Sequence, residues 1–177
     1  MQLWENGQKK LRINKRKFIY LISPNQIKKN FYSDLNKVLS TKKVEYFQLR
    51  LKKTNKKNIV LIGKKVKKIC KKHKVKFILN DNPYLAKTLD CDGCHLGQKD
   101  LNIKKAREII KKKIIGITCH NSKKLVTGAI KSKADYLAIG AFYASLTKKT
   151  KYKAKLGLIN EIKKLTKIPI VAIGGIN

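Results

Sequence analysis

Short β-branched runs alternate with lysine-rich amphipathic segments along almost the whole chain, and this rhythm constrains the fold more than any other feature. The runs expected to form strands are residues 18–23, 44–51, 75–80, 91–96, 114–119, 134–140 and 168–175. Helical patterns fill the connections between them, among them residues 30–40, 58–73, 82–90, 103–112 and 157–167. Seven strands that alternate with six helices predict parallel strands joined by right-handed crossovers.

Two architectures fit this rhythm, a doubly wound open sheet and a (β/α)8 barrel. No G-x-G-x-x-G follows the first strand, which disfavours a dinucleotide-binding sheet. Polar residues fall at the ends of strands two to seven, as in a barrel that gathers its site at one face, whereas an open sheet concentrates them at one switch point. We therefore predict an α/β fold of the TIM-barrel type.

The predicted domain organisation is simple. Residues 1–16 are expected to form a basic N-terminal extension, and residues 17–177 a barrel domain. Because the sequence stops just after the seventh predicted strand, we expect a barrel that is incomplete at its C-terminal end and lacks strand eight.

The chain is strongly basic, with 44 Lys and Arg against 10 Asp and Glu and a net charge of +34. Only four of the basic residues are arginines, the side chain that nucleic-acid readers favour, and the lysines are spread over every helical segment. We therefore expect no specific nucleic-acid partner, but a positive rim that attracts anionic small molecules. No apolar run approaches the roughly 20 residues of a membrane helix, and no signal-peptide pattern is present, so we predict no membrane partner and a cytoplasmic location.

The stretch CDGCH contains Cys91 and Cys94 in a C-x-x-C-H pattern, which haem-attachment, zinc and redox sites share. No second C-x-x-C exists, Cys70 and Cys119 are isolated, and a cytosolic location disfavours disulfides. We expect neither metal nor haem at these cysteines. His95 is expected to be structural.

The second predicted strand ends in QLRLK, where Gln48, Arg50 and Lys52 alternate with two leucines. Side chains of a strand alternate between its faces, so these three polar groups are expected to share the inward face. Buried cations are costly unless something neutralises them, and a polyanionic ligand would do so. The alternative is an edge strand with a wet face.

Asp81 and Asp100 follow the third and fourth predicted strands, which are neighbours in a barrel. Two carboxylates held together repel unless one is protonated or a cation lies between them. Magnesium prefers one or two carboxylates together with phosphate oxygens, so this pair beside a basic strand predicts a Mg²⁺–diphosphate site. The alternative is that each aspartate caps a helix.

The last three predicted strands also end in polar groups. Gly174 and Gly175 allow backbone N–H groups to approach a phosphate, which barrels commonly bind after strands seven and eight. His120 is a base, a hydrogen-bond donor or a structurally satisfied histidine. The remaining candidates are Thr118 after strand five, and Ser145, Thr147 and Lys148 after strand six.

These motifs resemble the thiamine-phosphate synthase/TenI family in order and approximate spacing. The matching stretches are QLRLK (48–52), LND (79–81), DGCHLGQKD (92–100), IGITCH (115–120), ADYLAIGAFYASLTK (134–148) and VAIGGI (171–176). The family pattern D-G-x-H-L-G-Q-x-D puts Cys94 at an ordinary apolar position. The functional part of that stretch is then its end, from Gln98 to Asp100.

The resemblance implies that a pyrimidine diphosphate, 4-amino-2-methyl-5-(diphosphooxymethyl)pyrimidine, condenses with a thiazole phosphate to give thiamine phosphate and diphosphate. It implies a pyrimidine-diphosphate site at Gln48, Arg50, Lys52, Asn80, Thr118 and Lys148. It implies a thiazole-phosphate site at Ser145, Thr147, Gly174 and Gly175, and Mg²⁺ at Asp81 and Asp100. Arg50, Lys52 and Lys148 would stabilise the charge that grows on the leaving group.

The loop after the sixth strand departs from the family pattern, because alanines replace two prolines at Ala141 and Ala144 and Ser145 replaces threonine. The alternatives left open are a TenI-like thiazole tautomerase with His120 as its base, an inactive truncated paralogue, and a non-enzymatic nucleic-acid binder. A homodimer is also left open.

Overall fold

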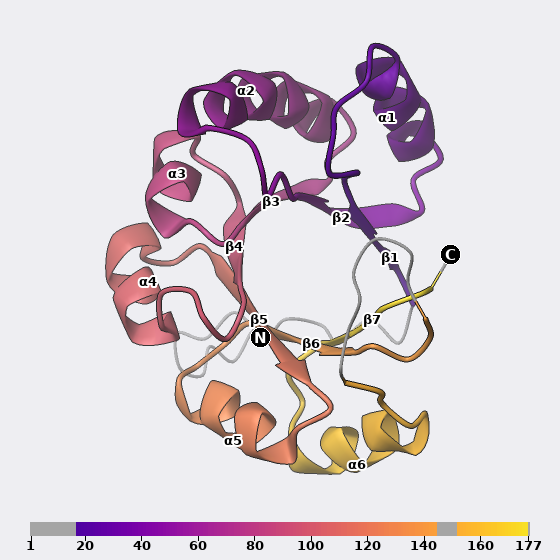
Figure 1. The fold of residues 1–177 in the computed structure, drawn as a ribbon, viewed down its shortest axis with the longest axis vertical. Helices are drawn as coiled ribbons and strands as arrows, with labels where there is room; N and C mark the ends of the chain where they lie inside the picture. The colour runs from indigo at the N-terminus through magenta and orange to yellow at the C-terminus, as the bar shows by residue number, and fades with distance from the viewer. Residues whose placement is uncertain (1–16, 145–151, 177) are drawn as a thin grey trace, which may run out of the picture.

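A computed structural model describes residues 17–144 and 152–176 of the chain, and these residues form seven parallel strands in one sheet. The strands are paired in sequence order, and helices surround them (Figure 1). The strands are β1 (Ile19–Ile22), β2 (Val44–Leu49), β3 (Lys76–Asn80), β4 (Gly93–Leu96), β5 (Ile114–His120), β6 (Tyr136–Gly140) and β7 (Ile170–Ile173). The helices are α1 (Phe31–Ser40), α2 (Lys56–Lys72), α3 (Pro83–Thr88), α4 (Ile103–Ile110), α5 (Lys123–Lys131) and α6 (Gly157–Leu165).

This architecture confirms the predicted barrel-type fold, with seven strands curved into a ring and the helices outside it (Figure 1). Within the described residues β1 and β7 are the two edges of the sheet, because each pairs with one neighbour only. The predicted N-terminal extension, residues 1–16, lies outside the described residues. No helix of the described part of the chain is long and apolar enough to cross a membrane.

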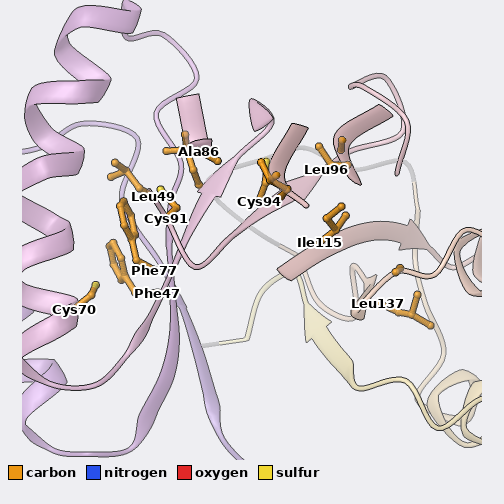
Figure 2. Packing of buried hydrophobic residues seen from close by; sticks show 14 of the residues in the cluster. Phe47, Leu49, Cys70, Phe77, Ala86, Cys91, Cys94, Leu96, Ile115 and Leu137 are labelled. Atoms are coloured by element: carbon orange, nitrogen blue, oxygen red, sulfur yellow. The ribbon is translucent and has the colours of Figure 1, made fainter. Parts of the chain in front are cut away.

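The outward face of the sheet forms the main hydrophobic core with the helices. Phe47 and Leu49 of β2 alternate with inward residues, as do Phe77 and Leu79 of β3, and all four are buried in one apolar cluster. Figure 2 shows the same layer continuing along the later strands through Leu96, Ile115 and Leu137. This period of two is what the sequence predicted for strands covered by helices.

The inward face carries a layer of polar and aromatic residues. Asn80, His95, Gly116 and Tyr136 are paired in register across β3, β4, β5 and β6. A Cβ atom on Gly116 would lie 1.8 Å from Cζ of Tyr136, so the Tyr136 ring lies directly over Gly116. The absence of a side chain there lets Tyr136 reach over β5 to His95.

The Tyr136 hydroxyl also joins the two sides of the sheet. It lies 2.7 Å from the hydroxyl of Tyr20 on β1, and the rings of Tyr20 and Tyr136 lie 5.5 Å apart between centroids. Tyr46 of β2 stacks on Tyr20 at 5.7 Å. These rings hold β1 to β6 through the barrel interior, where no strand pairing connects them in the described residues.

Polar side chains start most of the helices at the end of the barrel where the strands finish. Asn55, Asn82, Asn102 and Ser122 each accept a hydrogen bond from the backbone N–H three residues later. Such caps satisfy one of the unpaired N–H groups of a helix and fix where it begins. The short turns between strands and helices are therefore well determined, which holds the side chains that precede them in place.

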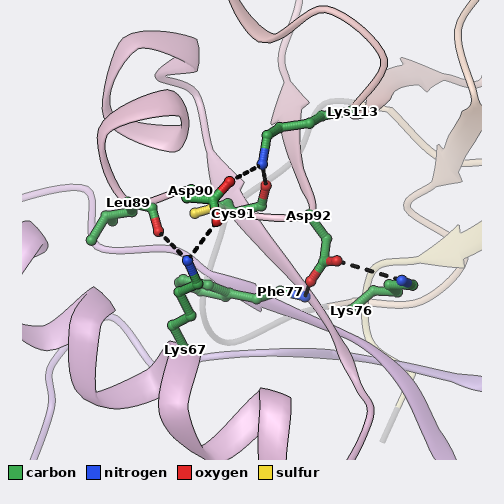
Figure 3. A network of polar contacts seen from close by, with 8 residues as sticks. All are labelled: Lys67, Lys76, Phe77, Leu89, Asp90, Cys91, Asp92 and Lys113. Carbon is green, nitrogen blue, oxygen red and sulfur yellow. Dashed lines mark hydrogen bonds and ion pairs between the residues drawn. The ribbon is translucent and has the colours of Figure 1, made fainter.

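The opposite end of the barrel is tied together by ion pairs (Figure 3). Asp90, just before β4, pairs with Lys67 of α2 at 2.9 Å and with Lys113 before β5 at 2.5 Å. The two lysines also donate to the carbonyl oxygens of Leu89 and Cys91. This network borders a cavity of about 400 Å³ and braces three consecutive connections.

Substitution of Gly116 by alanine tests the role of the inward layer. We expect Gly116→Ala to lower the free energy of unfolding by about 2 kcal/mol, because Tyr136 has to move and release its hydrogen bonds. Gly128→Ala is the matched control, since no heavy atom lies within 4 Å of the added Cβ. At this exposed position of α5 alanine is expected to raise stability by about 0.5–1 kcal/mol.

Urea denaturation followed by circular dichroism measures both changes. Equal effects of the two substitutions would contradict the assignment of Gly116 as the position that makes room for Tyr136.

Candidate active site

The candidate site lies at the carboxyl end of the strands, and Gln48 and Asn80 form its floor between β2 and β3. Gln48 is buried, with 3% of its surface exposed, and its side-chain Nε2 donates to Oδ1 of Asn80 at 2.5 Å. This bond uses the Gln48 amide nitrogen and the Asn80 amide oxygen, so the side-chain oxygen of Gln48 and the side-chain nitrogen of Asn80 are able to contact a ligand. The structure thus brings together two of the predicted pyrimidine-binding residues.

We predicted that Gln48, Arg50 and Lys52 share the inward face of one strand. Only Gln48 belongs to the strand, so this prediction is wrong for Arg50 and Lys52. Strand β2 ends at Leu49, and Arg50 and Lys52 lie in the loop that follows. The strand ends there because the Arg50 N–H donates to the Ser23 hydroxyl at 2.9 Å instead of continuing the ladder. The Arg50 guanidinium donates to Asn25 Oδ1 at 2.9 Å, so both cations stay at the rim rather than inside.

Lys52 forms an ion pair with Asp81, which directly follows β3. Asp81 has a φ of 66°, the left-handed region that aspartate tolerates better than most residues, and its N–H donates to the carbonyl of His95 at 2.7 Å. A hollow of about 190 Å³ beside Lys52, Asn80 and Asp81 extends toward the start of α2.

Asp100 lies close enough to Asp81 to affect its ionisation. Burial raises the pKa of the Asp81 carboxyl above its ordinary value, the nearby Asp100 carboxylate raises it further, and Lys52 opposes both. Asp100 itself accepts a hydrogen bond from the Gly97 N–H at 2.7 Å. The predicted approach of the two carboxylates is therefore present in the structure.

The alternative that these aspartates are helix caps does not hold. Asn82 caps α3 by accepting from the Leu85 N–H at 3.0 Å, and Asn102 caps α4 by accepting from the Lys105 N–H at 2.9 Å. Asp81 and Asp100 are thus not used to start a helix. Asp81 instead pairs with Lys52, and Asp100 accepts from the Gly97 N–H.

The donor set fits a magnesium ion that is bound together with a phosphorylated ligand. No group of three or more His, Cys, Asp or Glu side chains in the described residues could hold a metal ion by itself. Magnesium does not need such a group, because it binds through one or two carboxylates and takes its other ligands from water and phosphate. Burial is the main cause of the raised pKa of Asp81, and the nearby Asp100 carboxylate adds to it; a cation between two neighbouring carboxylates would relieve their mutual repulsion.

A hydrogen-bonded chain inside the barrel ends at Thr118, the candidate residue of β5. Nε2 of His95 lies 2.8 Å from the Thr118 hydroxyl, and Nδ1 of His95 lies 2.8 Å from the Tyr136 hydroxyl. Burial, the largest cause, lowers the pKa of His95 to about 4, so its ring is neutral at pH 7. His95 was expected to be structural, and it connects the Tyr136 hydroxyl to the Thr118 hydroxyl.

Sequence reasoning missed Tyr20 and Tyr136 as members of this chain. Both stand at inward-facing positions of their strands, but a tyrosine there is also compatible with an ordinary core. Gln98, at the functional end of its motif, donates to the carbonyl oxygen of Thr118 at 2.5 Å. It therefore supports the same residue from the rim.

His120, at the end of β5, stacks on the ring of Tyr152 with 4.2 Å between the ring centroids. Its φ of 52° turns the chain sharply at this point. The neighbouring Asn121 donates to the carbonyl of Lys153 at 3.0 Å. His120 therefore lies where the segment before α6 packs on the end of β5.

Gly174 and Gly175 follow β7 with φ angles of 90° and 66°. The loop after β6 packs directly on them, since Tyr143 N–H donates to the Gly174 carbonyl at 2.9 Å and a Cβ on Gly175 would lie 2.2 Å from the Ala144 carbonyl oxygen. The pair is therefore needed for the contact between the loops after β6 and β7. Ser145, Thr147 and Lys148 lie outside the described residues.

The C-x-x-C-H stretch is divided between the two faces of the sheet. Cys94 points into the outer apolar layer, as Figure 2 shows, whereas the next residue, His95, points into the barrel. All four cysteines are buried, and burial raises the pKa of Cys70, Cys91 and Cys119 to about 12. Their thiols are therefore protonated at neutral pH and packed as apolar groups.

A parallel barrel with cations, carboxylates and amides at the carboxyl ends of its strands has the arrangement of a (β/α)-barrel enzyme site. A family model described as thiamine monophosphate synthase matches residues 19–177. The thiamine-phosphate synthase of Pelagibacter ubique (strain HTCC1062) is 63% identical over 169 residues, which are 95% of this chain and 81% of that protein. That of Erythrobacter litoralis (strain HTCC2594) is 39% identical over 163 residues, 89% of this chain and 76% of that protein.

The structural comparison agrees. Thiamine phosphate pyrophosphorylase from Pyrococcus furiosus superposes with a TM-score of 0.79 and 29% identity, over 90% of this chain and 76% of that one. The chain therefore belongs to the thiamine monophosphate synthase family, which confirms the predicted family.

The buried, neutral His95 makes the fold sensitive to acid. In the unfolded chain the histidine binds a proton with a pKa of 6.5, whereas folded His95 binds one only near pH 4. The free energy of unfolding therefore decreases as the pH falls from 6.5 to 4. We expect this residue to reduce the free energy of unfolding by about 3 kcal/mol between pH 7 and pH 4. Urea denaturation of the wild type and His95→Gln at several pH values, without added metal, measures the difference. Parallel stability curves for the two proteins would contradict it.

Proposed function

We propose that this chain is a thiamine-phosphate synthase, which joins a pyrimidine diphosphate to a thiazole phosphate and releases diphosphate in thiamine biosynthesis. The observation that carries the proposal is the Lys52–Asp81 ion pair beside Asp100, at the carboxyl end of a barrel that belongs to this family. The two sequence relatives reported above, from Pelagibacter and Erythrobacter, carry the synthase name.

The diphosphate would be held at the rim by Arg50, Lys52 and the two aspartates. Asp81 and Asp100 would hold a Mg²⁺ ion, which when bound neutralises charge on the phosphate oxygens. Arg50 and Lys52 add fixed positive charge at the point where the leaving diphosphate gains negative charge. Binding of the ligand would draw Lys52 from Asp81 toward the phosphate.

The pyrimidine ring would lie deeper, over the Gln48–Asn80 pair and beside Thr118. Within the described residues the side-chain carbonyl of Gln48 and the side-chain amide N–H groups of Asn80 have no hydrogen-bond partner, so they offer an acceptor and a donor to an aminopyrimidine, which carries both kinds of group. Burial of Gln48 fixes its orientation before the ligand arrives, which reduces the entropy lost on binding.

The chemistry requires no protein nucleophile. The C–O bond between the pyrimidine methylene and the diphosphate breaks, the diphosphate takes the electron pair, and the ring-stabilised cation is attacked by the thiazole nitrogen. The protein contributes by holding the two substrates in line and by stabilising the leaving group. The thiazole phosphate is proposed to bind at Gly174 and Gly175 together with Ser145 and Thr147. Ser145 and Thr147 lie outside the described residues, as does Lys148, which is proposed to hold the diphosphate.

A TenI-like tautomerase is not favoured, because the relatives reported above are synthases. His120, its candidate base, stacks on Tyr152 and follows a different strand from the carboxylate pair. A cytoplasmic location and a homodimer stay predictions, which cell fractionation and analytical ultracentrifugation of the purified chain would test.

Purified protein supplied with the pyrimidine diphosphate, the thiazole phosphate and Mg²⁺ is expected to form thiamine phosphate. Chromatographic detection of the product measures the reaction, and chelation of Mg²⁺ by EDTA is expected to abolish it. Absence of product with all three components present would contradict the proposed function.

Asp81→Asn and Asp100→Asn are each expected to reduce turnover by about 100-fold or more, because they remove the charge that holds Mg²⁺ against the diphosphate. Raised Mg²⁺ should restore part of the activity. Full activity of the double variant, with unchanged circular dichroism, would reject the metal assignment.

Lys52→Met is expected to lower turnover by about tenfold or more, since it removes one of the positive charges that would stabilise the leaving diphosphate. Lys53→Met is the matched control, because Lys53 is the next residue, is exposed and forms no ion pair within the described part of the chain. Equal loss in both variants would mean that only the overall positive field matters.

A further inference from the structure

The residues directly after β1 hold the backbone of Arg50. Ser23 is buried, and its N–H donates to the Gln48 carbonyl of β2 at 2.9 Å. Its hydroxyl accepts a hydrogen bond from the Arg50 N–H, also at 2.9 Å. Leu49 and Leu51, on either side of Arg50, are buried in the outer apolar cluster. The main chain at Arg50 is therefore fixed by β1 and by the core, although it lies beyond the end of β2.

The side chain of Arg50 is held by the same segment. Asn25, two residues after Ser23, is exposed, and its Oδ1 accepts a hydrogen bond from Nη1 of Arg50 at 2.9 Å. Among the residues that the structure describes, no carboxylate pairs with this guanidinium. A guanidinium carries its N–H donors in one rigid plane. The bond to Asn25 therefore orients the plane and leaves the other donors and the positive charge available.

Arg107 shows how an arginine of this protein is used when its role is structural. Its guanidinium donates to three backbone carbonyl groups and to the Asp135 carboxylate. These bonds occupy most of its N–H groups and neutralise its charge. Arg50 differs, because in the described part of the chain its guanidinium is held by one neutral oxygen, that of Asn25.

We propose that Ser23 and Asn25 are positioning residues that fix Arg50 for a phosphate group at the rim, and that Asn25 does so without neutralising its charge. A carboxylate at position 25 would hold the guanidinium too, but it would compete with the phosphate. The amide oxygen avoids this competition. Because backbone and side chain are fixed before the ligand arrives, less entropy is lost on binding. That the phosphate belongs to the pyrimidine diphosphate rests on the proposed function.

Substitution of Asn25 by aspartate distinguishes this role from a merely structural one. Asn25→Asp keeps the shape of the side chain, so a structural role predicts no loss. We expect it instead to raise the Kd for inorganic diphosphate with Mg²⁺ by about tenfold or more, because the new carboxylate pairs with Arg50. Asn25→Ala, which only releases the guanidinium, should raise this Kd by about threefold. Isothermal titration calorimetry of the purified full-length chain measures both.

Gln26→Glu is the matched control for the added charge. Gln26 is the next residue, is exposed and has no contact with Arg50 within the described residues. Its Kd for diphosphate should stay within about twofold of the wild type, because the carboxylate does not occupy the guanidinium. Urea denaturation should show that Asn25→Asp is as stable as the wild type, so that weaker binding does not reflect unfolding.

An Arg50→Met background tests whether the two residues act through Arg50. Ser23→Ala removes the acceptor of the Arg50 N–H and should raise the Kd for diphosphate by about fivefold in the otherwise native chain. Once Arg50 is replaced by methionine, neither Ser23→Ala nor Asn25→Ala should change this Kd by more than about twofold.

The proposal is overturned if Asn25→Asp binds diphosphate as tightly as the wild type, or if Gln26→Glu weakens binding as much. It is also overturned if the Asn25→Ala effect is equally large without Arg50, or if the wild type binds no diphosphate. If the Kd values are as expected but no thiamine phosphate forms from the two substrates, the proposed function fails and the positioning role stands. If product forms but Asn25→Asp binds like the wild type, the proposed function stands and this inference fails.

Discussion

The contact of the Tyr136 ring with the backbone of Gly116, which has no side chain, is the constraint on which the interior of this barrel depends. A Cβ atom there would lie 1.8 Å from the ring of Tyr136, and without it the ring crosses β5 and reaches His95. The Tyr136 hydroxyl contacts both His95 on β4 and the Tyr20 hydroxyl on β1, so Tyr136 connects the first, fourth and sixth strands through the interior. The arrangement of these strands and the position of Thr118 at the mouth thus depend on the same contact.

Acidic residues are scarce in this chain, and their positions separate the two ends of the barrel. Only 10 Asp and Glu stand against 44 basic residues. Near the amino ends of the strands, Asp90 joins Lys67 to Lys113, and Asp135 accepts from Arg107 and from the Ile115 N–H. These carboxylates satisfy neighbouring groups and brace connections. At the carboxyl ends, Asp81 and Asp100 lie near each other, with a raised pKa at Asp81, and cap no helix. This pair of carboxylates is the place of the proposed Mg²⁺–diphosphate site.

Much of the fold and part of the site could be predicted from residue patterns. Short β-branched runs identified all seven described strands to within a few residues. The approach of Asp81 and Asp100 followed from the order of strands alone. The end of β2 could not be predicted, because Arg50 leaves the ladder for the hydroxyl of Ser23, which is distant in sequence. The partners of His95 were missed for the same reason, since Tyr136 is 41 residues away.

The sequence by itself determined the class of fold, the order of the strands and the chemical types of group at their ends. These follow from local periodicity and from the rule that consecutive parallel strands lie side by side. Only the tertiary structure decided which of those groups touch. It turned Cys94 outward and His95 inward, placed Lys52 against Asp81 and put the Tyr136 ring over Gly116. Such contacts depend on register and on the space left between side chains, which no local pattern encodes.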